Sequence, residues 1–145
     1  MTSKRRIVFD TNALISAAIL QNSVSNQALI LAAAQFEIVV SEATWTEFET
    51  RIERPKLFRY FGNLEAQREE VVKTINRVVK HIGVQSVITD CRDPDDNKFL
   101  ALALDSASEY IVTGDRHLLE LHPWRDVQVL TAGYFVRAMQ GVGPR

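Results

Sequence analysis

The sequence predicts a three-layer α/β/α fold around a central, mainly parallel sheet of five strands. Short β-branched and aromatic runs alternate with stretches of helical spacing from one end of the chain to the other. Turn and capping residues stand at most of the boundaries between them. The chain has 145 residues, 46% hydrophobic and 24% charged, which is the size and composition of one globular domain over residues 1–145.

The first half of the chain predicts two strands and three helices. The first apolar run stops at Asp10, as a buried parallel strand does, and Thr11 or Asn12 is expected to cap the helix that follows. Ser41 is expected to cap the third helix, which Pro55 ends because the residue before a proline disfavours helical geometry. The expected strands are residues 6–9 and 36–40, and the expected helices are residues 13–20, 24–35 and 42–53.

The second half predicts a long amphipathic helix followed by three more strands, each leading into a helix. Apolar residues recur at helical spacing from Leu64 to Ile82, and Gly83 is expected to stop this helix. An acidic turn then opens a helix that is apolar on nearly all sides, so we expect it to be central and buried. The expected strands are residues 84–88, 110–113 and 127–130, and the expected later helices include residues 99–104, 116–121 and 132–139.

Charge, cysteine content and hydropathy exclude several classes of protein. The net charge of -1 excludes a uniformly basic nucleic-acid binder and leaves only local patches for phosphate contact. Cys91 is the only cysteine, which excludes an intramolecular disulfide and a cysteine-based metal site and fits a reducing compartment. The N-terminus lacks a signal-peptide pattern, and no apolar stretch reaches the roughly 20 residues of a membrane helix. We therefore expect a cytoplasmic protein with no membrane partner.

Four acidic residues far apart in sequence are expected to meet at one edge of the sheet. Asp10 and Asp115 directly follow strands, and Asp96 and Glu47 lie in early turns of helices that are entered from the same edge. Ligands of open α/β sheets bind beyond the carboxyl ends of the strands. Clustered carboxylates destabilise the fold unless a cation joins them. Oxygen ligands without cysteine or a spaced histidine pair favour Mg²⁺ or Mn²⁺ over zinc.

Each of these residues also has a plainer interpretation. Asp10 and Asp115 can act simply as helix caps, and an acidic helix residue such as Glu47 is usually solvated. Asp93 and Asp95 are explained equally well as turn residues and as partners that orient metal ligands. Structural or surface positions are expected for the three histidines and the cysteine, which are His81, His117, His122 and Cys91.

Four segments carry a recognisable pattern: residues 7–12 (Ile-Val-Phe-Asp-Thr-Asn), the helix around Glu47, residues 93–103 (Asp-Pro-Asp-Asp-Asn-Lys-Phe-Leu-Ala-Leu-Ala) and residues 111–116 (Ile-Val-Thr-Gly-Asp-Arg). In their order and context they resemble the PIN domain family, related to the PilT N-terminus, and most closely its toxin components of toxin–antitoxin systems. The resemblance covers nearly the whole chain and implies a PIN-like fold. The choice of Asp96 over Asp95 or Asp93 rests on its spacing to residues 101–103.

The resemblance assigns roles to named residues. It implies that the acidic metal-binding and catalytic positions are Asp10, Glu47, Asp96 and Asp115, with Thr113 as the hydroxyl beside them. Supporting roles are expected for Thr11, Asn12, Asp93 and Asp95. Five basic residues could contact an RNA backbone, although surface lysines and arginines usually just face solvent. These five are Arg51, Arg54, Lys56, Arg59 and Arg116.

The activity that the resemblance implies is cleavage of RNA phosphodiester bonds with Mg²⁺ or Mn²⁺, which activates water and stabilises the leaving oxygen. A cognate antitoxin and a homodimer are the partners expected by resemblance. The alternative is a PIN fold that binds nucleic acid or protein without cleaving, but such a module would lack one or more of the four acids. A dinucleotide-binding enzyme would need a glycine-rich turn after the first strand, and an aspartyl phosphatase a second aspartate where Asn12 stands.

Overall fold

The computed structural model describes residues 4–61 and 65–141. Five strands form one sheet in the order β3-β2-β1-β4-β5, and all four pairings are parallel, as the sequence predicts. The order of the strands reverses between β1 and β4, which is where open α/β sheets bind ligands. The strands are β1 (Arg6–Phe9), β2 (Glu37–Val40), β3 (Val79–His81), β4 (Tyr110–Val112) and β5 (Gln128–Leu130).

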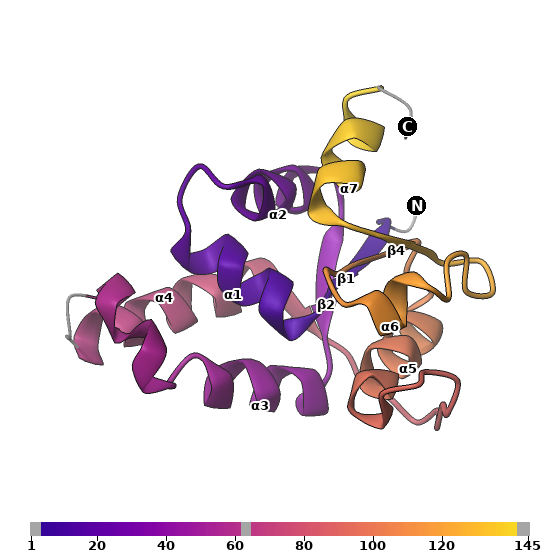
Figure 1. Cartoon of the computed structure of the whole chain (residues 1–145), viewed down its shortest axis with the longest axis horizontal. Helices are drawn as coiled ribbons and strands as arrows, with labels where there is room; N and C mark the ends of the chain where they lie inside the picture. The colour runs from indigo at the N-terminus through magenta and orange to yellow at the C-terminus, as the bar shows by residue number, and fades with distance from the viewer. Residues whose placement is uncertain (1–3, 62–64, 142–145) are drawn as a thin grey trace.

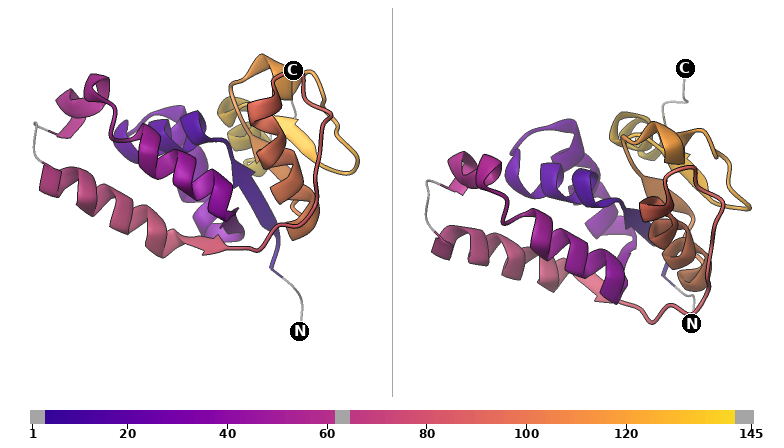
Figure 2. Two further views of the ribbon diagram at one scale, coloured as in Figure 1. Left: turned by 90° about the horizontal axis from the view of Figure 1, so that it is seen from below. Right: turned by 60° about the horizontal axis from the view of Figure 1, so that its bottom comes forward.

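Helices cover both faces of the sheet and complete a three-layer fold (Figures 1 and 2). Helices α1, α2, α4 and α7 lie against one face, and α5 and α6 lie against the other. Their bounds are α1 (Thr11–Ile19), α2 (Val24–Gln35), α3 (Glu42–Arg51), α4 (Glu65–Val78), α5 (Asn97–Ser106), α6 (Arg116–Leu119) and α7 (Ala132–Met139), with short 3₁₀ helices η1 (Pro55–Phe61) and η2 (Pro94–Asp96).

The alternation of side chains along the strands creates two hydrophobic cores. Ile7 and Phe9 of β1 belong to the core beneath α1, α2 and α7, and Val8 between them belongs to the core beneath α5. Helix α5 is buried along most of its length, as its apolar composition predicts. Because β1 and β4 are held between two cores, the residues that follow these strands have a rigid base.

The third strand differs from the expectation. Residues 84–88 form no strand; instead, β3 follows α4 directly, and Val79 pairs with Ile38 of β2. The backbone N–H groups of Gln85 and Ser86 donate to Asp105 at the C-terminal end of α5. Of the apolar residues that favour a strand here, Val84 and Ile88 instead pack against the core beneath α5, and Val87 is exposed. The prediction that α4 continues to Ile82 is wrong because residues 79–81 pair with β2, and its expected start at Leu64 lies outside the described residues.

The N-terminal cap differs from the expectation in α1 and agrees with it in α3. The prediction that Thr11 or Asn12 caps α1 is wrong, because Asp10 occupies the cap and its Oδ1 accepts a hydrogen bond of 2.8 Å from the N–H of Ala13. The prediction for Ser41 is confirmed, since its hydroxyl caps α3. Within the described residues no single helix is long and apolar enough to cross a membrane, although α1 and α2, bent by 98° to each other, pass as a pair on length and composition.

Candidate active site

Asp10 and Asp115 are joined at the carboxyl end of the sheet by one buried hydroxyl. Asp10 follows β1 and is 6% exposed, and its Oδ2 accepts a hydrogen bond from Thr113, which follows β4. The same hydroxyl accepts a hydrogen bond of 2.9 Å from the N–H of Asp115. Burial raises the pKa of Asp10 above its usual value, although the hydrogen bonds from Thr113 and Ala13 oppose that change. Thr113 therefore lies directly beside Asp10, and the supporting role that the family resemblance implies for it stays a prediction.

Asp96 approaches this pair from the start of α5. Burial, a side-chain hydrogen bond with Asp115, and the charges of Asp115, Asp93 and Asp10 together raise the pKa of Asp96 from 3.8 to about 7. Burial also acts on Asp115, but its hydrogen bonds with Asp96 and with the N–H of His117 lower the pKa of Asp115. The structure thus brings Asp10, Asp96 and Asp115 together from three separate segments of the chain.

One oxygen of Asp96 has no partner. Its Oδ2 is buried and accepts no hydrogen bond from any described residue. A buried carboxylate oxygen in this state is costly unless a cation or a donor reaches it. The set of three aspartates with an unsatisfied oxygen fits a divalent ion that prefers oxygen ligands.

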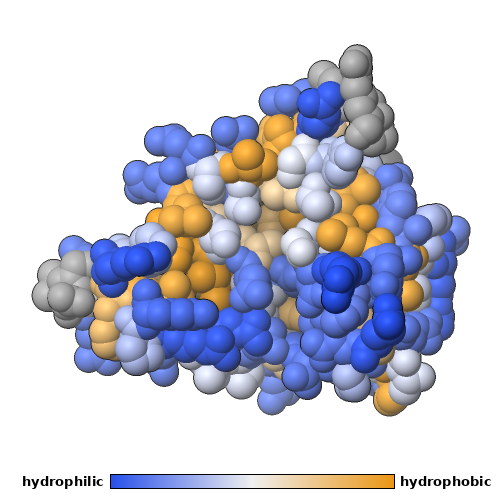
Figure 3. Space-filling view, in the orientation of Figure 1, coloured by the Kyte–Doolittle hydropathy of each residue, from blue (hydrophilic) through white to orange (hydrophobic). Residues whose placement is uncertain are grey.

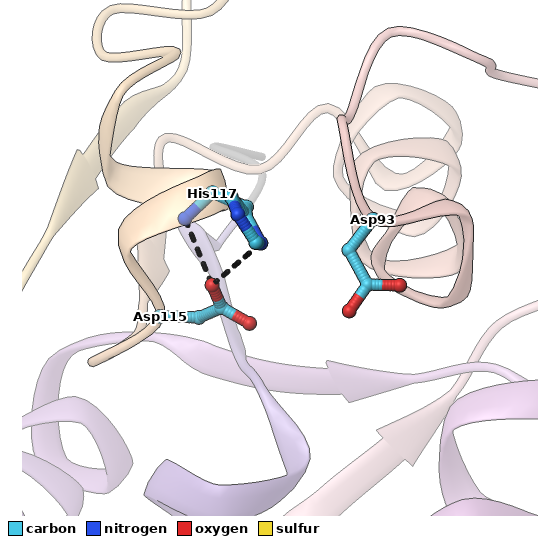
Figure 4. A group of neighbouring side chains, drawn as sticks. All are labelled: Asp93, Asp115 and His117. Carbon is cyan, nitrogen blue, oxygen red and sulfur yellow. Dashed lines mark hydrogen bonds and ion pairs between the residues drawn. The ribbon is translucent and has the colours of Figure 1, made fainter.

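His117 extends this group, although the sequence predicts only a structural or surface role for it. Its Nδ1 lies 3.7 Å from Oδ1 of Asp115, and ligand atoms of Asp93, Asp115 and His117 all lie within 4.8 Å of one another. Figure 4 shows Asp93 facing the other two side chains from a separate loop. The only sequence signal for His117 is its place two residues after Asp115, which brings it back over the cap of α6.

The two acidic residues beside Asp96 differ in their surroundings. Asp93 caps η2, since its Oδ1 accepts a hydrogen bond of 3.1 Å from the N–H of Asp95, and it also belongs to the group with Asp115. Both interpretations of Asp93 therefore remain compatible with its position. The side chain of Asp95 is exposed.

Glu47 lies on α3 in a different charge environment. Its Oε2 is 2.6 Å from Nζ of Lys98 and 3.5 Å from Nη2 of Arg51, and its Oε1 accepts a hydrogen bond from Thr11. Burial opposes ionisation, but the hydrogen bonds from Lys98 and Thr11 and the charges of Lys98 and Arg51 lower the pKa of Glu47 overall. Glu47 points inward from α3, which its sequence neighbours alone leave undecided.

Arg51 connects Glu47 to the start of α1, where its Nη1 donates a hydrogen bond of 3.2 Å to Oδ1 of Asn12. Of the five basic residues predicted to contact RNA, Arg51 alone is part of this network; the others, Arg54, Lys56, Arg59 and Arg116, are exposed. Figure 3 shows hydrophilic side chains along α3 at the bottom of the view. The basic residues at the start of β1 lie at the opposite edge of the sheet, where Arg5 pairs with Glu109 and Arg6 with Glu37.

A family model described as PIN domain matches residues 6–117. The chain belongs to the PIN domain family. The uncharacterized protein MJ1680 of Methanocaldococcus jannaschii is 34% identical to it over 120 residues, which are 81% of this chain and 76% of that protein. Asp10, Glu47, Asp96 and Asp115 of this PIN domain all lie within the matched region.

The fold of this PIN domain is also similar to a solved structure. A chain in the crystal structure of VapBC2 from Rickettsia felis, bound to a DNA fragment from its promoter, matches with a TM-score of 0.59 and 12% sequence identity. The match covers 86% of this chain and 96% of that chain. The likeness confirms the predicted PIN-like α/β/α architecture.

Proposed function

We propose that this PIN domain is a metal-dependent endoribonuclease and the toxin of a toxin–antitoxin pair. The observation that carries the proposal is the convergence of Asp10, Asp96 and Asp115, with the buried Oδ2 of Asp96 left without a partner among the described residues. Such an arrangement is costly to folding without a cation, so a functional requirement is the simplest reason for it.

Mg²⁺ or Mn²⁺ is the cofactor that this set of oxygens suits, and Asp10, Asp96 and Asp115 would hold it. Such an ion supplies Lewis-acid activation of water and charge stabilisation at the scissile phosphate. The residues of the chain prepare the site: Thr113 fixes the carboxylate of Asp10, and the N–H of His117 fixes that of Asp115. Asp96 must lose its proton before it can bind a cation well.

The proposal for RNA as substrate rests on the exposed basic residues beyond Arg51. Arg54, Lys56 and Arg59 lie between α3 and α4, and no described acidic residue forms an ion pair with them. Exposed cations without an acidic partner attract a phosphate backbone without requiring a particular base sequence.

The enzymatic part of the proposal is tested with purified protein and labelled single-stranded RNA, structured RNA and single-stranded DNA, each with Mn²⁺, Mg²⁺ or chelator. We expect RNA cleavage that chelator abolishes and that Asp10→Asn reduces at least 100-fold, about the loss when a group central to catalysis is removed. RNA binding without cleavage would instead identify a silent binding module. Cleavage that persists with chelator, or in the Asp10→Asn protein, would refute the metal mechanism.

The toxin part is tested separately by induced expression in cells. We expect growth arrest with the wild-type chain and normal growth with Asp10→Asn at the same protein level. Co-expression of the gene adjacent to its own should restore growth if that gene encodes the antitoxin. Active nuclease that does not arrest growth would contradict the toxin role while leaving the enzymatic proposal intact.

A further inference from the structure

Glu47 differs from the three aspartates because the chain supplies its cations. Lys98 and Arg51 both approach Oε2, and Thr11 donates to Oε1, so both oxygens have partners. The side chains of Glu47 and Lys98 are only 19% and 23% exposed. A close, largely enclosed ion pair of this kind is much stronger than one in open solvent.

The three aspartates have the opposite environment. No lysine or arginine among the described residues forms an ion pair with Asp10, Asp96 or Asp115, and one oxygen of Asp96 has no partner. Asp96 immediately precedes α5 and Lys98 lies in its first turn, so the start of this helix contributes to both parts. The acidic edge thus has one part without a lysine or arginine ion pair among the described residues, although the charge of Arg51 acts on Asp10, and one part in which Lys98 directly pairs with Glu47.

We propose that Lys98 takes the place of a divalent ion at Glu47, so that the site binds one Mg²⁺ or Mn²⁺ among the aspartates and Glu47 is not a ligand. A divalent ion at Oε2 would be repelled by the ammonium that lies 2.6 Å from the same oxygen. Displacing that ammonium would break an ion pair whose two side chains are largely shielded from solvent, which is costly. Lys98 is thus a positioning residue that holds Glu47 away from the metal.

The surroundings of Lys98 also place it where a substrate can reach. Lys98 lines a cleft of about 680 Å³ between α3, the start of α5 and the segment after β3. Backbone-contacting lysines act as point charges toward phosphate. The inference rests on the proposed metal site, but it does not depend on RNA as the substrate.

The first test is calorimetric titration of the apo protein with Mn²⁺ alone. We expect one bound ion for the wild type and a Kd for Glu47→Gln within about 3-fold of it, which corresponds to less than 1 kcal/mol. The matched control is Asp115→Asn, for which we expect a loss of at least 10-fold, the effect of removing a direct ligand. A loss for Glu47→Gln as large as that of the control would overturn the inference.

The second test asks whether Lys98 is what keeps Glu47 from the ion. Lys98→Met removes the ammonium and keeps the apolar stem, so Glu47 becomes available as a ligand. We expect Lys98→Met to bind Mn²⁺ at least 5-fold more tightly than the double variant Lys98→Met with Glu47→Gln. Equal affinities would overturn the inference. Lys98→Arg should behave like the wild type, since it keeps the charge.

These outcomes also separate the inference from the proposal on which it rests. If the wild type binds no Mn²⁺ in the titration, the proposed metal site itself is refuted. If the wild type binds Mn²⁺ and Glu47→Gln removes that binding, the metal site stands and only the role of Lys98 fails. Circular dichroism melts before each titration establish that every variant is folded, and the double variant, which removes both partners, provides a folded comparison if Lys98→Met alone does not fold.

Discussion

Replacing Asp96 by asparagine should stabilise the metal-free protein above neutral pH. Asp96 has its pKa raised from 3.8 to about 7, so between these values the folded state keeps a proton that the unfolded state releases. Stability from this group is fully present below about pH 4 and is lost as the pH rises through 7. Asparagine has nearly the same shape and no charge, so the Asp96→Asn protein should not lose this stability as the pH rises.

The size of the effect follows from the shift in pKa. Each pKa unit corresponds to about 1.4 kcal/mol, so about three units set an upper limit of roughly 4 kcal/mol at about pH 8. Asp96 is half-buried, and Asp115 shares the charge with it while its own pKa is lowered, so we discount the expected gain to about 2 kcal/mol. For a chain of this length that raises the melting temperature by roughly 4–8 °C.

Thermal melts of the wild type and Asp96→Asn in chelator, at about pH 5 and about pH 8, provide the assay. We expect the two proteins to differ little at the lower pH and the variant to melt at the higher temperature at the upper pH. Saturating Mn²⁺ should reverse the order, because only the wild type gains the full binding energy, about 2.7 kcal/mol at 100 times Kd. A variant that melts lower than the wild type at both pH values would refute the reasoning and would show that Asp96 is structural.

Three further outcomes follow from the same contacts. Thr113→Val should lower the free energy of unfolding, measured by urea denaturation, by about 1–3 kcal/mol, because it leaves a buried oxygen of Asp10 without its donor. Thr113→Ser should recover part of that loss. Ser41→Ala should lower the free energy of unfolding by about 1 kcal/mol through the cap of α3 and leave Mn²⁺ affinity unchanged, because α3 supplies no ligand to the proposed site; an affinity loss would contradict that assignment. Below about pH 7 the wild-type affinity for Mn²⁺ should rise roughly tenfold per pH unit and then level off, a slope that Asp96→Asn should lack.

The position of the site follows from the sequence because parallel strands end at one edge. Asp10 and Asp115 directly follow buried runs, so their meeting requires only that β1 and β4 are neighbours, as the pairing of Val8 with Ile111 shows. Thr113 and Asp96 follow from the same geometry. The inward direction of Glu47 does not, since it depends on contacts with Thr11 of α1 and Lys98 of α5.

The failure at the third strand has a different cause. The β-branched residues in 84–88 favour a strand locally, whereas a strand also needs a partner edge for its backbone. Residues of β3 already pair with β2, and Asp105 takes the N–H groups of Gln85 and Ser86. Residues 79–81 and residues 84–88 could each pair with β2, and the choice between them depends on contacts with distant parts of the chain. A local sequence pattern carries no information about those contacts.

Lys98 and His117 escape sequence reasoning for a related reason. Each lies two residues from a predicted ligand, Asp96 or Asp115, and each is an ordinary residue for the start of a helix. Their importance comes from partners on other elements: Lys98 meets Glu47 across α3 and α5, and His117 meets Asp93 across the end of the sheet. Spacing along the chain identifies ligands that share an element, but it cannot identify those that meet only in the folded state.

The division of the acidic edge gives the two kinds of carboxylate opposite effects on stability. Asp96 is unfavourable in the metal-free fold because it is partly buried beside carboxylates of the same sign, whereas at Glu47 the contacts with Lys98, Thr11 and Arg51 outweigh the effect of burial. Neutralising Asp96 should therefore stabilise the apo protein, and Glu47→Gln should destabilise it, since Lys98 would lose its charged partner. Melting both variants in chelator tests this without any metal or substrate. If both changes stabilised the protein, the ion pair with Lys98 would contribute nothing to the fold, and the proposed difference between Glu47 and the aspartates would be refuted.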